Sequence, residues 1–399
     1  MLQLLILVFL KAQAKEFFVL SDIHYNIGFE TNLTFPCQVP SGALGKLRCD
    51  TPKEVIESTL TYMQSLNSNP EFIVVLGDSL SHYTLSLSKE GEVDSVQNKF
   101  LVRQSHIEVT DLLSRYFPNT QIVQVLGNND GYANYKKPTE REAAQFYDFL
   151  FELWRPFTSI SSSFYDGGYY TTHTKDFFLV VLNTNFFSVR NEESKDAHEQ
   201  LNWLDEQLEH DQQTIVLLHI PPGFEMFNWG EQTWHPSFAE SFIRIIQKHQ
   251  GHIRLILGGH YHNGGFQLIP GTNLGVLLHN SLSGIFFNNP GFRKYTYTPD
   301  SLDFSEYSLD LLDSSPNWKY SYAYSELFGT LSLEEALEIE QEEVFDQFIA
   351  KSFGFPEPNE LMWKVATNDT QNTSYSRQVA LCSFKFIKAS DFLNCKNKQ

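Results

Sequence analysis

Few basic residues and few cysteines are present in this sequence, and repeats and low-complexity tracts are lacking. The 29 Lys and Arg residues are outnumbered by 48 Asp and Glu, which gives a formal net charge of −19. A nucleic-acid duplex is therefore an unfavourable partner, because binding a phosphate backbone normally requires a basic surface. With 42% hydrophobic residues, the 399-residue chain can fill a sizeable core, in one large domain or two unequal ones.

Long apolar runs are also scarce. Residues 2–10 are apolar but too few to span a bilayer, and Ala12-Gln13-Ala14 then matches a small-x-small cleavage site. The sequence thus predicts a signal peptide over residues 1–14, no transmembrane segment, and a secreted or lysosomal (vacuolar) location. Three N-glycosylation sequons agree with export, and they begin at Asn32, Asn368 and Asn372.

The four cysteines form two pairs that are close in sequence, Cys37 with Cys49 and Cys382 with Cys395. Four cysteines allow three connectivities, but loop closure is easiest within each local pair. In an oxidising compartment both pairs would be disulfides. Neither pair has the spacing of a zinc finger.

Several nearly continuous apolar runs end in polar residues that can bind a metal ion or a phosphate. They read "FFVLSDIH", "FIVVLGDSLSH", "IVQVLGNND", "TIVLLHIPPG" and "IRLILGGHYH". Such runs are typical of strands that are buried on both faces of a sheet. Helix-like segments lie between them, including Thr51–Ser65, Ala197–Leu208 and Phe238–His249. This alternation predicts an α/β sandwich whose sheets are covered by helices.

The pattern changes near residue 295, where the sequence becomes aromatic and irregular before a further helical stretch. We therefore expect residues 15–295 to form the main α/β domain. Residues 296–399 are expected to form a small helical C-terminal subdomain that Cys382 and Cys395 close.

The polar residues at the ends of the apolar runs predict a two-metal site, because ligands gather at the carboxyl ends of strands in such sheets. Mixed imidazole and carboxylate ligands suit zinc, iron or manganese better than calcium or magnesium. Two such ions can hold a hydroxide between them and clamp a phosphoryl group during in-line attack. The candidate ligands are Asp22, His24, Asp78, Asn128, His219, His260 and His262, with Asp78 bridging the two ions.

The order DxH, GD, GN, H and GHxH resembles the calcineurin-like metallophosphoesterases, and "GDSLSH", "LNTN" and "HIPPG" resemble the acid sphingomyelinase-like phosphodiesterases within them. This resemblance implies a metallophosphoesterase β-sandwich flanked by helices. It also implies two ions, usually zinc. One ion would be bound by Asp22, His24, Asp78 and His262, and the other by Asp78, Asn128, His219 and His260.

One departure from the family pattern concerns catalysis. Asn129 occupies the position of the family histidine that is held to protonate the leaving oxygen. Either the metals alone must then support the leaving group, or His82, which matches a family histidine near the substrate phosphate, must supply the proton. General acid catalysis contributes about a hundredfold or more, so an alcohol leaving group should suffer most from the loss.

The leading hypothesis for function is therefore hydrolysis of sphingomyelin or a related phosphodiester, with a lipid headgroup or a nucleotide as substrate. Asn129 favours an alternative, hydrolysis of phosphoanhydrides in nucleotides or polyphosphate. A metal-binding protein without activity is a third hypothesis. A lipid substrate would imply peripheral membrane contact, for which Trp229, Trp234 and His235 are candidates, although local packing is the more ordinary role of such residues.

Overall fold

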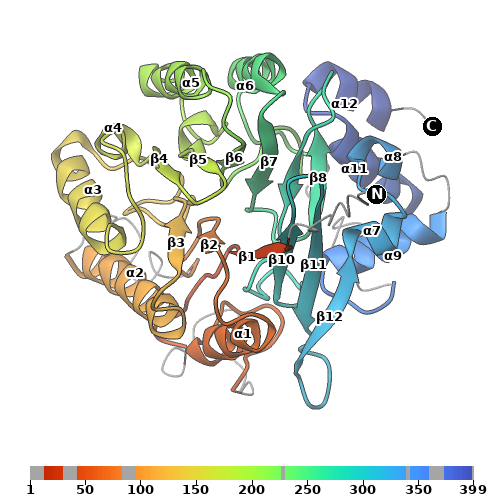
Figure 1. Cartoon of the computed structure of the whole chain (residues 1–399), viewed down its shortest axis with the longest axis horizontal. Helices are drawn as coiled ribbons and strands as arrows, with labels where there is room; N and C mark the ends of the chain where they lie inside the picture. Colours follow the sequence, from red (N-terminus) through yellow and green to blue (C-terminus); the bar gives the residue numbers. More distant parts are fainter. Residues whose placement is uncertain are drawn as a thin grey trace, which may run out of the picture.

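The computed structural model describes residues 13–29, 43–82, 96–225, 230–337, 342–358 and 373–397. Within these residues, two six-stranded sheets form a sandwich with helices around it (Figure 1). This arrangement confirms the predicted α/β sandwich. In the same parts of the chain, no helix has the length and apolar character needed to cross a bilayer.

The first sheet has the strand order β12-β11-β10-β1-β2-β3 and the second the order β4-β5-β6-β7-β9-β8. The strands of the first are β1 (Lys15–Leu20), β2 (Phe72–Val75), β3 (Gln121–Gln124), β10 (Gly291–Tyr297), β11 (Leu302–Leu309) and β12 (Trp318–Ala323). Those of the second are β4 (Tyr170–His173), β5 (Phe178–Val181), β6 (Thr214–Leu217), β7 (Ile253–Gly258), β8 (Gly265–Leu268) and β9 (Gly275–Leu278). Strands β1 to β3 are parallel, as are β5 to β7, so each group ends at one edge of its sheet.

The helices that cover the sheets include the three segments expected from the sequence. In order along the chain they are α1 (Lys53–Leu66), α2 (Val96–Tyr116), α3 (Glu140–Trp154), α4 (Phe164–Gly167), α5 (Lys195–Gln207) and α6 (Pro236–His249). Helices α1 and α2 share an apolar cluster with the first sheet, and α5 and α6 share one with the second.

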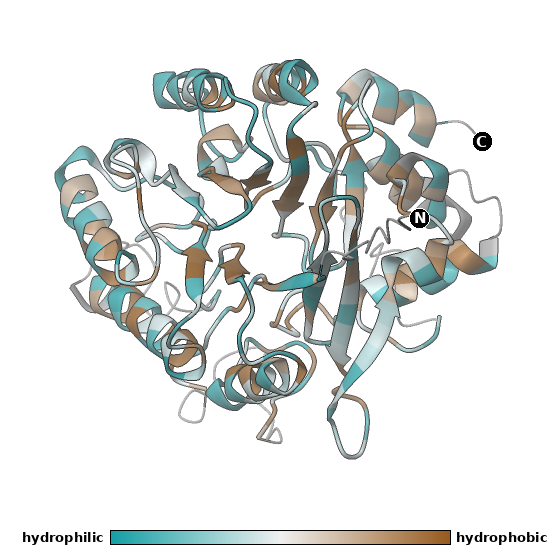
Figure 2. Cartoon of the chain, viewed as in Figure 1, coloured by the Kyte–Doolittle hydropathy of each residue, from teal (hydrophilic) through white to brown (hydrophobic). Residues whose placement is uncertain are grey.

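Strand β1 shows why the apolar runs are continuous. Phe17 and Val19 belong to the core between the sheets, whereas Phe18 and Leu20 pack with α1 and α2. Because side chains alternate between the faces of a strand, a strand covered on both faces must be apolar at every position. In Figure 2, strands such as β2 and β7 are brown, whereas the surrounding helices carry long teal stretches.

The expected boundary at residue 295 does not coincide with the end of the sandwich. It falls inside β10, which pairs with β1, and β11 and β12 extend the same sheet to Ala323. Strand β12 exposes Lys319 and Tyr320 and so lacks the continuous apolar pattern that marks a central strand. Residues 296–323 therefore belong to the sandwich, and the helical part begins after them.

The C-terminal helices lie together on one side of the molecule, beside β8 and β11 (Figure 1). They are α7 (Tyr324–Phe328), α8 (Leu333–Leu337), α9 (Glu342–Ser352), α11 (Thr373–Lys385) and α12 (Ala389–Lys396). Phe266 of β8 packs against Phe348 and Phe384, with ring centroids 5.9 and 5.5 Å away. This aromatic contact joins the helices to the second sheet.

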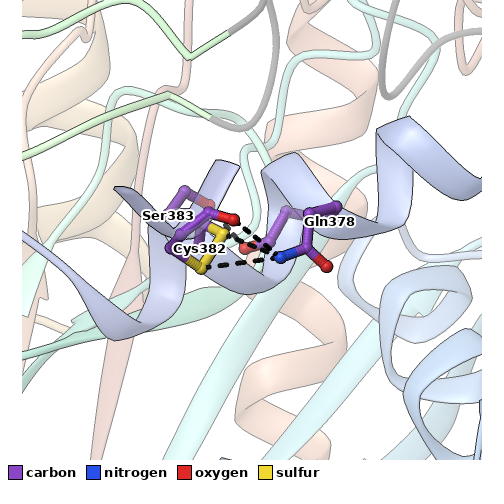
Figure 3. Close-up of a disulfide and its surroundings, with 5 residues drawn as sticks. Gln378, Cys382 and Ser383 are labelled. Carbon is purple, nitrogen blue, oxygen red and sulfur yellow. Dashed lines mark hydrogen bonds between the residues drawn. A yellow bond between two sulfur atoms is a disulfide. The ribbon is translucent and has the colours of Figure 1, made fainter. Parts of the chain in front are cut away.

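A disulfide between Cys382 and Cys395 joins α11 to α12, as predicted. Gln378 lies beside it and donates a hydrogen bond of 2.9 Å to the carbonyl of Cys395 (Figure 3). The other predicted pair includes Cys37, which lies outside the described residues. Residues 1–12 of the predicted signal peptide and the three sequons, at Asn32, Asn368 and Asn372, lie outside them as well.

Candidate metal centre

The strand ends bring all seven predicted ligand residues to one region of the sandwich. They follow β1, β2, β3, β6 and β7, which are strands whose carboxyl ends meet at the same edge. In chain order these residues are Asp22, His24, Asp78, Asn128, His219, His260 and His262.

The backbone at this edge is strained. Non-glycine residues have positive φ angles between 45° and 74° at five of these positions, namely Asp22, His24, Asp78, His260 and His262. Each such residue costs on the order of 1–3 kcal/mol, and strain of this kind concentrates at functional sites. The loops also approach closely, since a Cβ atom on Gly77 would lie 2.7 Å from the backbone nitrogen of Gly127.

The carboxylate of Asp78 lies between two groups of ligand atoms. Its Oδ2 is 3.5 Å from His24 Nε2 and 3.3 Å from His219 Nε2. On the His24 side, Asp22 Oδ1 lies 3.5 Å from His262 Nε2. One cluster therefore contains Asp22, His24 and Asp78, and another contains Asp78, His219 and His260.

Hydrogen bonds orient two of the imidazoles. Nδ1 of His24 donates to the carbonyl of Leu80 at 2.8 Å, and Nδ1 of His219 donates to that of Leu76 at 2.7 Å. Nε2 of each ring is then the nitrogen that faces Asp78 and can bind a cation. A second ring nitrogen held by a backbone carbonyl is the usual arrangement of histidines that ligate metals.

Asn128 is oriented in a similar way. Its Nδ2 donates to Oδ1 of Asn134 at 2.9 Å, and its own Oδ1 lies 3.0 Å from His219 Nε2. The amide oxygen, which can bind a metal, therefore faces the cluster that contains His219.

The charges at this site favour a bound cation. Burial raises the pKa of Asp22 to about 7. Burial opposes a positive charge on His219, but the nearby Asp78 and Asp22 carboxylates outweigh it and raise the pKa of His219 to about 9. Burial lowers the pKa of His24 to about 4 and that of His260 to about 3. The carboxylates of Asp78 and Asp22, which favour a positive charge on His219, would equally favour a divalent transition-metal ion, and binding of the ion would displace the ring proton.

His82 lies against this site and has a carboxylate partner that the sequence pattern did not reveal. Its ring stacks on that of His24 with centroids 3.8 Å apart. Its Nδ1 and its backbone N–H donate to Asp50, at 3.0 and 2.9 Å. Burial opposes a positive charge on His82, but Asp50 outweighs this effect and raises the pKa of His82. Asp50 precedes α1 and follows no strand, so an argument from strand ends could not find it.

Asn129 and Asp130 both hold Asp78 in place. The backbone N–H and the side-chain Nδ2 of Asn129 donate to the two oxygens of Asp78, each at 2.7 Å. The carboxylate of Asp130 accepts hydrogen bonds from the backbone N–H groups of Asp78 and Gly127. An amide donates hydrogen bonds without releasing a proton, so Asn129 orients Asp78 and supplies no acid.

Of the three candidates for lipid contact, Trp234 has the more ordinary role, which is local packing. Trp234 is fully buried, its ring lies tilted against that of Phe187 with centroids 4.6 Å apart, and its indole N–H donates to the carbonyl of Ile220. It therefore packs locally and cannot contact a lipid surface. His235 precedes α6 and its Nε2 lies 2.7 Å from the carbonyl of Asn191, while Trp229 lies outside the described residues.

The sandwich and the paired clusters of histidine and aspartate define a metallophosphoesterase with a binuclear divalent metal site. Residues 16–264, more than half of the chain, match the family model for calcineurin-like phosphoesterases, and the chain belongs to that family.

Several curated relatives narrow this assignment. An acid sphingomyelinase-like phosphodiesterase 3b of Mus musculus is 28% identical, with 79% of this chain and 76% of the relative covered. A sphingomyelinase phosphodiesterase D of Dictyostelium discoideum is 25% identical, with 82% and 83% covered. A cyclic GMP-AMP phosphodiesterase of Homo sapiens is 24% identical, with 73% and 69% covered. These similarities confirm the predicted resemblance to acid sphingomyelinase-like phosphodiesterases, and the chain is a metal-dependent phosphodiesterase.

Proposed function

We propose that this chain is a secreted or lysosomal zinc phosphodiesterase that hydrolyses sphingomyelin or a related phosphodiester. The observation that carries the proposal is the position of Asp78, whose Oδ2 lies within 3.5 Å of imidazole nitrogens from both clusters. A carboxylate placed in this way can bridge a pair of ions a few ångströms apart.

Seven side chains would hold the ions. We assign Asp22, His24, Asp78 and His262 to one ion and Asp78, Asn128, His219 and His260 to the other. Imidazole and carboxylate ligands suit zinc, iron or manganese, and we expect zinc because it is the usual ion of the family. When bound, two such ions supply a nucleophile at neutral pH and offset the charge of the phosphate.

The remaining residues orient these ligands and the substrate. Asn129 and Asp130 hold the carboxylate and the backbone of Asp78, respectively. Asp50 holds Nδ1 of His82, which leaves Nε2 to contact the substrate phosphate or to deliver a proton to the leaving oxygen. We assign this role to His82 because its ring lies against that of His24.

The named activities of the relatives support a diester as substrate. One of them is named a sphingomyelinase phosphodiesterase, another an acid sphingomyelinase-like phosphodiesterase and the third a cyclic GMP-AMP phosphodiesterase, so both lipid and nucleotide diesters are candidates. A lipid substrate would require the protein to contact a membrane surface peripherally. The disulfide between Cys382 and Cys395 supports an oxidising compartment.

A second candidate function is hydrolysis of phosphoanhydrides in nucleotides or polyphosphate. It is favoured by Asn129, which offers only hydrogen bonds to Asp78 where an acid would help an alcohol to leave. A phosphate leaving group is already a stable anion and needs that acid less.

The test is release of phosphocholine from sphingomyelin by the purified protein with added zinc, at acidic and at neutral pH. The His219→Ala variant is the blank. His173→Ala is the matched control, since it removes an exposed imidazole of β4. Release above the blank, with the control active, supports the proposal. No release from a zinc-loaded protein would favour the anhydrides, and no turnover on either class would indicate a binding protein.

A further inference from the structure

Tyr135 holds a strained backbone conformation in the loop that follows the predicted ligand Asn128. Its φ angle is 63°, in the left-handed region that a bulky aromatic residue rarely adopts. Two hydrogen bonds fix it there, because its N–H donates to the carbonyl of Asn128 and its carbonyl accepts from Nδ2 of Asn191, both at 2.9 Å. Backbone strain that is held in place by the surrounding structure is concentrated at functional sites.

The hydroxyl of Tyr135 reaches the metal centre. It lies 3.5 Å from Nε2 of His260, and the two rings meet edge to face with centroids 5.9 Å apart. At 3.5 Å the contact is too long for a strong hydrogen bond, so the hydroxyl is not committed to the imidazole. His260 and Tyr135 are both partly exposed, whereas His24, His219 and His262 are buried. Tyr135 therefore lies on a side of the centre that solvent reaches.

The phenol is available as a hydrogen-bond donor. A phenol that keeps its proton can donate one hydrogen bond. A phosphate ester presents acceptor oxygens, and donors fixed in advance around such a group stabilise the charge that develops on it.

We propose that Tyr135 is a catalytic residue whose hydroxyl donates a hydrogen bond to a nonbridging oxygen of the substrate phosphate. This inference rests on the proposed function, because it requires a phosphate ester beside His260. The contact is made to the phosphoryl group and leaves the departing group untouched. Loss of the hydroxyl should therefore slow the cleavage of diesters and of anhydrides by a similar factor.

The test compares Tyr135→Phe with Tyr132→Phe in the zinc-loaded protein. The first variant keeps the aromatic ring, and with it the same steric restriction on the backbone, and removes only the hydroxyl. The second variant removes the hydroxyl of Tyr132, a buried core residue of the same loop. That hydroxyl accepts a hydrogen bond from Arg103. We expect Tyr135→Phe to lower kcat/KM by about tenfold or more on both substrate classes. Inorganic phosphate, measured by calorimetry, should bind to it more weakly, and zinc content should stay unchanged.

Each outcome decides the proposal. An unchanged affinity for phosphate in Tyr135→Phe, or an equal loss in Tyr132→Phe, overturns it. Loss of zinc from Tyr135→Phe also overturns it, because the tyrosine would then act by supporting His260. If the wild type cleaves no diester or anhydride and yet Tyr135→Phe binds phosphate more weakly, the contact stands and the proposed function fails.

Discussion

Replacing Asn129 by histidine should change which phosphate bonds this protein cleaves fastest. In the structure, both nitrogens of Asn129 donate to the carboxylate of Asp78 at 2.7 Å. The side chain therefore sits within hydrogen-bonding distance of the proposed bridging ligand. An imidazole at this position would add a proton donor beside the proposed metal centre.

Two opposing effects set the magnitude. The variant loses the hydrogen bond from Nδ2 to a charged carboxylate, which is worth about 1.5–3 kcal/mol. Because Asp78 is then held less firmly, the cleavage of every substrate should become slower. The new acid contributes about 100-fold or more, equivalent to about 2.7 kcal/mol, and only where an alkoxide must leave. The ratio of kcat/KM for sphingomyelin to that for a nucleotide anhydride should thus rise by about 100-fold.

The assay measures kcat/KM for both substrates in wild type, Asn129→His and Asn129→Ala, at equal zinc content. Alanine removes the same hydrogen bond without adding an acid, so its ratio should match that of the wild type. An unchanged ratio in Asn129→His, or an equal shift in both variants, would refute the argument that residue 129 selects the leaving group.

Three further changes test the site and the fold. His219→Ala should lose one of two bound ions and lower kcat/KM by more than about a hundredfold; metal analysis showing both ions retained would contradict the ligand assignment. Asp50→Ala should destabilise the protein by about 1–3 kcal/mol in urea, because the ring N–H of His82 loses its acceptor; an unchanged unfolding midpoint would count against it. Glu306→Gln should cost about 3–5 kcal/mol, because Arg293, which is 1% exposed, would lose its charged partner. Replacing both Arg293 and Glu306 by apolar residues should cost less than Glu306→Gln alone, and a larger cost would argue against this account.

The apolar runs of the sequence located the strands and the residues that follow them. Phe17 to Leu20 are apolar at every position because both faces of β1 are covered, and that pattern is visible without coordinates. The carboxyl ends of parallel strands share an edge, so Asp78 and His219 could be expected to lie close together although 140 residues separate them.

The end of the sandwich could not be located in the same way. Strand β12 exposes part of its length and carries a mixed polar and aromatic pattern, so its sequence resembles a loop. It is a strand because β11 offers backbone partners, from Ser305 with Ala323 to Leu309 with Trp318. Pairing of this kind depends on a neighbour that is distant in sequence, and local pattern carries little information about it.

The sequence by itself determined the class of fold, the residues at the strand ends and the family, because each of these depends on local periodicity and short motifs. Only the tertiary structure decided which groups act on those residues. Asp50 reaches His82 across 32 residues, Asp130 holds the backbone of Asp78, and Tyr135 reaches His260 across 125. The physical reason is that a hydrogen bond forms only when donor and acceptor are placed to within a few tenths of an ångström. The packing of loops brings them to that distance, and loop packing produces no periodic pattern in the sequence.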